Sequence, residues 1–220
     1  MTLPTLGIAA VAAWLTGLSL MALAVRSRWP QQREWSRKLV HIGAGAVLPL
    51  AWLFGIDRLV AVPAAAAVTL LALLNHRMRV LPAIEDINRP SFGTVAYGAS
   101  ITILLLLCWP ERAAAASAGV LVMAFGDGLA GLIGPLRPSP SWEVLGERRS
   151  LLGTGTMALA SLLTLAVLAA VCRAQGVSAP SDAGLVGIAA AAVLLEQVAI
   201  GGLDNLSVPL AVAGLWALLA

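Results

Sequence analysis

The sequence contains few charged residues, and its composition does not suit a soluble domain. Only 11% of its 220 residues are charged, whereas 60% are hydrophobic. Soluble globular domains carry about 25% charged residues. This balance indicates a membrane protein, and the length leaves room for several crossings but for no separate soluble domain. We therefore expect residues 1–220 to form one membrane-embedded domain.

Cysteine, histidine and lysine are scarce as well. Cys108 and Cys172 are too few for a zinc set or a Cys-x-x-Cys motif, and we expect them to be packed membrane cysteines. Lys38 is the single lysine and lies outside any Walker A pattern, so a P-loop enzyme is excluded. The net charge of +3 does not indicate nucleic-acid binding, because the basic residues lie in short loops between apolar runs.

Apolar runs of about the length that crosses a bilayer follow one another along the chain. They cover residues 5–25, 39–56, 59–75, 93–109, 113–134, 151–172, 184–200 and 206–220. Segment 135–150, rich in proline and charge, is expected to be a loop. The sequence thus predicts an all-α, polytopic helix bundle with about eight transmembrane helices.

The basic residues divide unequally between the two sides of such a bundle. Eleven would lie on one side: Arg26, Arg28, Arg33, Arg37, Lys38, Arg77, Arg79, Arg89, Arg137, Arg148 and Arg149. Only Arg58, Arg112 and Arg173 would lie on the other. Because basic loops stay in the cytoplasm, we expect an integral protein of the bacterial inner membrane with both termini outside the cytoplasm.

One carboxylate stands in the middle of the fifth run. Segment 119–134 is apolar or glycine except for Asp127, and Gly131 and Gly134 follow at helical spacing on the same face. An acid within a membrane span is costly and usually functional, and the two glycines would admit a ligand or a second backbone. The alternative is a packing stripe of small residues with Asp127 bonded to a neighbouring helix.

Two further acids flank the break between the last two runs. Glu196 and Asp204 lie on either side of Gly201 and Gly202, so the backbone could bring both to one point. Mg²⁺ takes one or two carboxylates and leaves its other positions to water and phosphates. We therefore expect Asp127, Glu196 and Asp204 to be metal ligands. For Glu196 the alternative is a polar contact between helices.

Basic residues stand at the starts of two runs. Arg37 and His41 share a helix face beside Lys38, and Arg148 and Arg149 precede the Gly-rich start of the sixth run. Arginine matches phosphate oxygens, and a helix start offers free backbone N–H groups to an anion. The alternative for these residues is topological charge alone. The pattern favours phosphate chemistry on a lipid.

These residues resemble the motifs of the membrane-embedded polyprenol kinases, the family of phytol, farnesol and dolichol kinases and the CTP-dependent diacylglycerol kinase. Five motifs carry the resemblance in family order: Arg37, Lys38 and His41; Arg89, Ser91, Phe92, Gly93 and Thr94; Asp127, Ala130 and Gly134; Arg149, Ser150, Gly153 and Thr154; Glu196, Asp204, Asn205 and Pro209. Arg149 replaces the lysine of many members. Leu152 replaces the glutamate of the dolichol and diacylglycerol branches, which favours the phytol or farnesol type.

The resemblance implies phosphorylation of a prenyl alcohol (phytol, geranylgeraniol or farnesol) by CTP with Mg²⁺ at the cytoplasmic face. Asp127, His41 and Lys38 would act in catalysis, with Asp127 or His41 taking the hydroxyl proton. The nucleotide would be bound by Arg37, Arg89, Ser91, Gly93, Thr94, Arg148, Arg149, Ser150, Gly153, Thr154 and Asn205. The alternatives are a phosphatidate cytidylyltransferase-like enzyme, which would release pyrophosphate, and a small-molecule transporter, whose polar groups would lie near the midplane.

Overall fold

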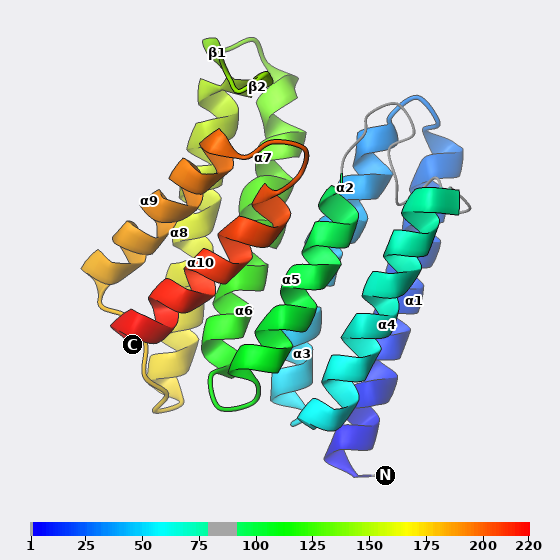
Figure 1. Ribbon diagram of the computed structural model, residues 1–220, viewed down its shortest axis with the longest axis vertical. Coiled ribbons are helices and arrows are strands. Elements are labelled where there is room, and N and C mark those ends of the chain that lie inside the picture. Colours follow the sequence, from blue (N-terminus) through cyan, green and yellow to red (C-terminus); the bar gives the residue numbers. More distant parts are fainter. Residues whose placement is uncertain (1, 79–91) are drawn as a thin grey trace.

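The computed structural model describes residues 2–78 and 92–220, which form a bundle of helices with one small hairpin (Figure 1). The helices are α1 (Leu3–Arg28), α2 (Arg33–Ala44), α3 (Val47–Leu53), α4 (Arg58–Met78), α5 (Gly93–Cys108), α6 (Ala113–Leu121), α7 (Gly128–Ile133), α8 (Leu151–Ala174), α9 (Asp182–Val198) and α10 (Asp204–Leu219). A π-helical turn, η1 (Val122–Asp127), joins α6 to α7, and a 3₁₀ turn, η2 (Gly134–Leu136), follows α7. The predicted all-α class is confirmed.

The apolar runs correspond to helices, but these helices differ from one another in length. Four helical segments are long and apolar enough to cross a membrane: α1, α4, the segment Ala113–Leu136 that contains α6, η1 and α7, and α8. Helices α5 and α10 are apolar but shorter. The second run is divided into α2 and α3 by a turn at Gly45 and Ala46. The structure thus confirms apolar helices of membrane type, and the number of eight crossings stays a prediction.

Helix α6 lies at the centre of the bundle. All residues from Ala113 to Val120 are buried, and the helix packs against α10, α5 and α3. Its side chains are mostly alanine, and small residues let neighbouring helices approach closely. Gly119 shows this most clearly, since a Cβ atom there would lie 2.3 Å from the carbonyl oxygen of Pro209.

Helices α1 and α4 lie at the edge of the bundle. Helix α4 packs mainly on α5, and α1 packs mainly on α2 and α3. Both expose large apolar side chains, among them Leu20, Leu70 and Leu71. Exposed apolar faces of this extent fit contact with lipid.

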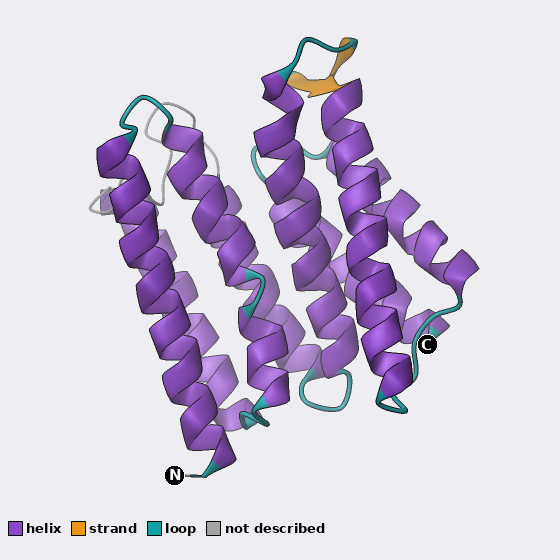
Figure 2. Cartoon of the chain, turned by 180° about the vertical axis from the view of Figure 1, so that it is seen from behind, coloured by secondary structure: helices purple, strands orange, loops and turns teal. Residues whose placement is uncertain are grey.

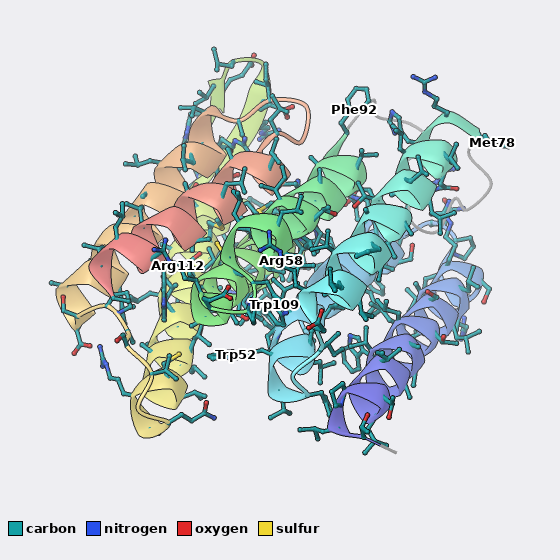
Figure 3. All side chains as sticks on the ribbon, turned by 60° about the horizontal axis from the view of Figure 1, so that its bottom comes forward. Trp52, Arg58, Met78, Phe92, Trp109 and Arg112 are labelled. Carbon is teal, nitrogen blue, oxygen red and sulfur yellow. The ribbon has the colours of Figure 1, made fainter. Side chains whose placement is uncertain are left out.

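Helix ends with polar residues gather at one end of the bundle. The end of α1, the start of α2, the end of α4 and the turn between α9 and α10 lie toward the same end as the hairpin, and both termini lie toward the other (Figures 1 and 2). Figure 3 brings the opposite end forward, with Trp52, Arg58, Trp109 and Arg112 labelled there. At that end Trp109 Nε1 donates to the carbonyl of Ile56 at 2.9 Å, and Arg58 donates to the carbonyl of Leu106.

The segment expected to be a loop contains a β-hairpin. Strands β1 (Ser141–Val144) and β2 (Glu147–Ser150) pair antiparallel, with Ser141 opposite Ser150. Leu145 and Gly146 form the turn, and both have positive φ, at 52° and 81°. Positive φ at both positions is the geometry of a tight two-residue hairpin turn. The hairpin lies at the end of the bundle where α8 begins and α9 ends (Figure 1).

Candidate active site

The polar centre of the site is an ion pair between α2 and the end of η1. Lys38 Nζ lies 2.6 Å from Asp127 Oδ2 and 3.1 Å from the carbonyl oxygen of Asp127. The side chains are 6% and 16% exposed. Gly131 makes the contact possible, because a Cβ there would lie 2.4 Å from Lys38 Cε. The glycines near Asp127 therefore admit a lysine side chain from α2.

The backbone around Asp127 is irregular. Asp127 is the last residue of the π-helical turn η1, and α7 resumes at Gly128. Such turns are rare, occur mostly as short insertions in α-helices and are frequent at functional sites. Gly126 lies within this turn, where a Cβ would lie 2.6 Å from Met157 Sδ on α8. Because a π-helical turn shifts the helical register, Asp127 lies on a different face of the helix than a regular continuation of α6 would give it.

His41 supports Asp127 from the other side. Its Nε2 lies 3.1 Å from the carbonyl oxygen of Met123 and 3.3 Å from Asp127 Oδ2. Both neighbours accept hydrogen bonds, so Nε2 carries the hydrogen. The ring packs against Tyr97 with centroids 4.5 Å apart, and the Tyr97 hydroxyl donates to the carbonyl of Val120 at 3.2 Å. This nitrogen therefore cannot take a proton from a substrate while those contacts last.

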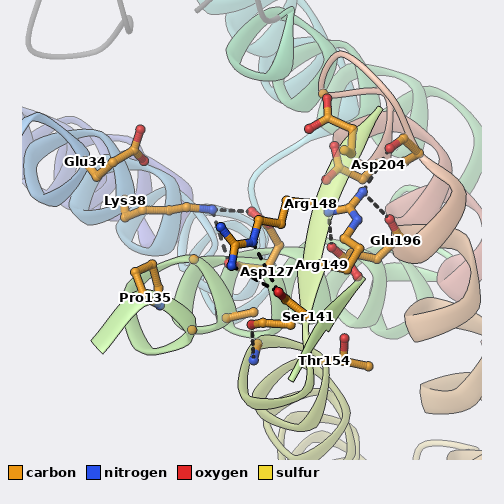
Figure 4. A pocket seen from close by; sticks show the side chains of 18 of the residues that line it. Glu34, Lys38, Asp127, Pro135, Ser141, Arg148, Arg149, Thr154, Glu196 and Asp204 are labelled. Carbon is orange, nitrogen blue, oxygen red and sulfur yellow. Dashed lines mark hydrogen bonds and ion pairs between the residues drawn. The ribbon is translucent and has the colours of Figure 1, made fainter. Parts of the chain in front are cut away.

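The two hairpin arginines have different surroundings. Arg149 donates to the Glu196 carboxylate and to the backbone carbonyls of Glu196 and Ala199, at 2.6 Å and 2.9 Å for the two carbonyls. Within the described residues, the Arg148 side chain has one hydrogen-bond partner, the hydroxyl of Ser141, which lies 3.0 Å from its Nη2. Arg149 therefore fastens the hairpin to the end of α9. The guanidinium of Arg148 faces the middle of the pocket (Figure 4).

A hydrogen-bond network extends from Glu196 to the start of α8. Glu196 Oε1 is bound by Arg149, and its Oε2 accepts from Gln197 Nε2 at 2.7 Å. The same Gln197 nitrogen donates to Thr154 Oγ1 at 3.0 Å, and Trp142 Nε1 donates to the Gln197 side-chain oxygen at 3.1 Å. Both oxygens of Glu196 are thus in use within the protein. Glu196 acts in this arrangement as the partner of Arg149.

The expected anion site at the start of α8 is already occupied by the chain itself. The amide of Gly153 donates to Ser150 Oγ at 3.1 Å, and that of Leu152 donates to Ser139 Oγ at 3.3 Å. The amide of Leu151 donates to the carbonyl of Pro140 at 2.9 Å. The prediction of free N–H groups here was wrong, because the hairpin and the preceding loop cap the helix. Ser150 is an N-cap, and Gly153 allows close approach of Gly134.

The start of α10 contributes the third acid. Asp204 Oδ1 accepts from the backbone amide of Asn205 at 3.0 Å and from its side chain at 2.9 Å. Asn205 also donates to the carbonyl of Gly202 at 3.3 Å. Gly201 and Gly202 have φ of 61° and 85°, which favours glycine. These glycines therefore turn the chain so that Asp204 faces the same space as Asp127.

One pocket of about 830 Å³ unites these elements (Figure 4). It is lined by residues of α2, α7, the hairpin, α8, α9 and α10. Of the predicted site residues, it brings together Arg37, Lys38, Asp127, Arg148, Arg149, Ser150, Gly153, Thr154, Glu196, Asp204 and Asn205. The structure thus joins residues more than 150 positions apart at one end of the bundle.

Some predicted residues lie elsewhere. His41 does not line the pocket but contacts Asp127 from behind, and Gly93 and Thr94 lie at the start of α5 outside the pocket lining. Arg89 and Ser91 lie outside the described residues. The segment 92–94 is tied to the site indirectly, since the amide of Phe92 donates to the carbonyl of Gly201 at 3.1 Å.

Several pocket residues were not expected from the sequence. They are Glu34, Arg137, Ser139, Ser141 and Glu147. Gln197, which does not line the pocket, was also missed although it joins Glu196 to Thr154. Glu34, Glu147 and Gln197 lie close in the sequence to the predicted residues Arg37, Arg148 and Glu196, whereas nothing in the sequence marks Ser139 or Ser141 as site residues. Side-chain polarity in a loop does not by itself predict a site.

The three acids differ in the carboxylate oxygens that they leave available to Mg²⁺. Asp127 Oδ1 and Asp204 Oδ2 have no hydrogen-bond partner within residues 2–78 and 92–220, whereas both oxygens of Glu196 have one. Within the described residues no three His, Cys, Asp or Glu side chains are grouped closely enough to hold a metal alone. Mg²⁺ needs only one or two carboxylates when substrate phosphates complete its shell. Asp127 and Asp204 therefore fit this ion.

The fold and pocket define a class of protein: an apolar helix bundle with a polar pocket of about 830 Å³ at one end, lined by basic and acidic side chains in equal number, among them two carboxylates with an oxygen available to a ligand. The chain is 41% identical over 181 residues to a phytol kinase of Synechocystis sp., an alignment that covers 80% of this chain and 76% of the relative. The chain belongs to the phytol kinase family. No family model matches it, and no solved structure matches it.

Proposed function

We propose that this chain transfers the terminal phosphate of CTP to a prenyl alcohol, namely phytol, geranylgeraniol or farnesol. The relative's name supports a kinase that acts on a prenyl alcohol. The observation that carries the proposal is the pocket in which the Lys38–Asp127 pair, Arg148 and Asp204 face one space. Phosphoryl transfer requires mainly positioning and charge neutralisation, which these groups supply.

The reaction proceeds by attack of the alcohol oxygen on the terminal phosphorus. The new O–P bond forms, the bond between that phosphorus and the bridging oxygen breaks, and CDP leaves. Asp127 Oδ1 accepts the hydroxyl proton, because Oδ2 is held by Lys38 and His41. Lys38 and His41 fix the carboxylate in one orientation. His41 is therefore a positioning residue in this scheme, and Asp127 is the general base.

Cationic residues would bind the nucleotide. Arg148 has the guanidinium best placed to meet phosphate, and Arg37 also lines the pocket. Asp204 would hold Mg²⁺, which would neutralise phosphate charge when bound, and Asp127 Oδ1 stays available for the hydroxyl proton. Arg149 contributes by holding the hairpin that presents Arg148.

The enzyme assay uses the purified protein in detergent with terminally labelled CTP and a panel of alcohols that includes phytol, farnesol, undecaprenol and diacylglycerol. The proposal predicts labelled prenyl monophosphate and CDP. Release of pyrophosphate would instead identify a cytidylyltransferase, and absence of transfer from any nucleotide to any prenol would contradict the proposal. Parallel assays with ATP, GTP and UTP identify the donor.

We place the pocket at the cytoplasmic face of a bacterial membrane because of the unequal distribution of basic residues. A cysteine replacing Ser139, which lines the pocket, should be protected from membrane-impermeant reagents in intact cells. One replacing Ser178, in the turn between α8 and α9, should be labelled. The reverse labelling pattern would contradict this orientation.

A further inference from the structure

A second groove, which is apolar, lies between α1 and α4 at the edge of the bundle. Its volume is about 290 Å³, and it separates α1 and α3 from α4 and α5. Its lining comes from α1, the end of α2, α3, α4 and α5, and includes Leu15, Leu48, Val68 and Ile101. Every side chain in this lining is apolar, so the groove suits a hydrocarbon and offers no polar group to an ionic ligand.

The groove begins beside the polar site and extends away from it. Ala44 lines its inner end and follows His41 by three residues, or about 4.5 Å of helical rise. Gly98 also lines that end and follows Tyr97, which packs on His41. Ile8, Val60 and Leu105 line the other end, near the termini side of the bundle. The His41–Tyr97 ring pair thus lies between the groove and Asp127.

Small side chains keep this space open. Helix α4 contributes Ala61, Ala64 and Ala65 to the groove, and α1 contributes Ala12. Ala12 and Ala64 are exposed, so neither is covered by a neighbouring helix. Because α4 packs mainly on α5 and α1 mainly on α2 and α3, α1 and α4 have few close contacts with each other.

We propose that this groove holds the hydrocarbon tail of the alcohol substrate, with the head end beside His41 and Tyr97. The inference rests on the proposed function and deepens it by assigning the residues that bind the tail. The occupant is one prenyl chain, since the lining is apolar throughout and the groove approaches the reacting site at its His41–Tyr97 end. Burial of apolar surface drives the binding, and the length of the groove determines the preferred chain length.

The test compares two phenylalanine substitutions on α4. Ala64→Phe fills the groove, whereas Ala66→Phe adds the same ring to an exposed position of α4 outside the groove lining. Both proteins are purified in detergent. kcat and KM are measured for geraniol, farnesol, geranylgeraniol and phytol, together with the KM for CTP. Ala12→Phe and Ala13→Phe on α1 provide a second matched pair.

The proposal predicts that Ala64→Phe and Ala12→Phe lower kcat/KM for phytol and geranylgeraniol at least about tenfold, which is within the effect of steric changes in apolar substrate pockets. The loss should be smaller for geraniol, and the KM for CTP should stay unchanged, which also shows that the protein is folded. Ala66→Phe and Ala13→Phe should resemble the wild type.

Two other outcomes are distinguishable. If the wild type phosphorylates phytol but groove and control variants behave alike, the groove holds only bilayer lipid and the inference is wrong. If the wild type phosphorylates no prenol, the proposed function is wrong and this inference falls with it.

Discussion

Two buried ion pairs border the same pocket, and their surroundings differ. Lys38–Asp127 joins α2 to the end of the π-helical turn, and Asp127 keeps one oxygen without a partner among the described residues. In Arg149–Glu196 the carboxylate has a partner at both oxygens, and the guanidinium also binds two carbonyls at the end of α9. The Lys38–Asp127 pair therefore keeps a hydrogen-bond acceptor for a substrate, whereas the Arg149–Glu196 pair uses its hydrogen bonds to hold the hairpin.

The largest expected effect on stability follows from removing one member of the first pair. Lys38→Met leaves the Asp127 carboxylate buried without its cation, which costs about 3–5 kcal/mol when a buried pair is broken. The melting temperature in detergent should fall accordingly, and turnover should be lost. Adding Asp127→Asn to Lys38→Met should recover most of the melting temperature but none of the turnover.

The outcome of the double variant separates two explanations. Recovery of stability alone means that Asp127 is needed for chemistry and that Lys38 compensates its charge. Recovery of activity together with stability would show that the pair only packs the helices, as in the alternative of a small-residue stripe.

A smaller effect is expected at the second pair. Arg149→Gln loses its bonds to the Glu196 carboxylate and to the carbonyls of Glu196 and Ala199. Glu196 keeps its bond from Gln197, so we expect a net cost in stability of about 1.5–3 kcal/mol, the range of one hydrogen bond to a charged group. We expect a lower melting temperature and greater protease sensitivity of the hairpin. The melting temperature of Arg149→Lys should lie between those of the wild type and Arg149→Gln, because lysine keeps the charge but loses the forked geometry of the guanidinium. A normal melting temperature with a raised KM for CTP would instead assign Arg149 to phosphate.

The smallest change in stability is expected at Arg148. Arg148→Gln should leave the melting temperature unaltered, because the side chain of Arg148 donates only to the hydroxyl of Ser141 among the described residues. Loss of one charge-assisted phosphate contact of about 1.5–3 kcal/mol should raise the KM for CTP roughly 10- to 150-fold. Steady-state titration of CTP at saturating phytol measures this effect. Arg26→Gln is the control and should change the KM less than about twofold; equal effects at both arginines would contradict a phosphate contact at Arg148.

The sequence predicted the helical class and most of the polar residues that line the pocket. Apolar length located the helices, and the rarity of acids in apolar runs drew attention to Asp127, Glu196 and Asp204. Both signals are local, so they can be recognised without knowing the fold. The close approach at Gly134 was also anticipated, and Gly153 of α8 makes it.

Other features depended on contacts between distant segments. The π-helical turn before Asp127 has no periodic signal in residues 122–127. The hairpin was missed because its turn uses Leu145 and Gly146, whereas Asn-Gly or Asp-Gly is the usual signal. The partners of Arg149 lie about 50 residues further along the chain, and Ser139 and Pro140 cap the start of α8. These contacts determine whether Arg148 or Arg149 is available to bind phosphate. A local sequence pattern could not predict them, because the partners are distant in the sequence.

The most direct test compares two amide substitutions, Asp127→Asn and Glu196→Gln, each made in the purified enzyme. kcat is measured with CTP and phytol on the folded, monodisperse fraction, at a temperature below the melting point of both variants. The account predicts that Asp127→Asn lowers kcat at least about 100-fold, as expected for loss of a general base, while Glu196→Gln lowers it less than about tenfold. Equal losses, or a larger loss at Glu196, would contradict the assignment of chemistry to the Lys38–Asp127 pair.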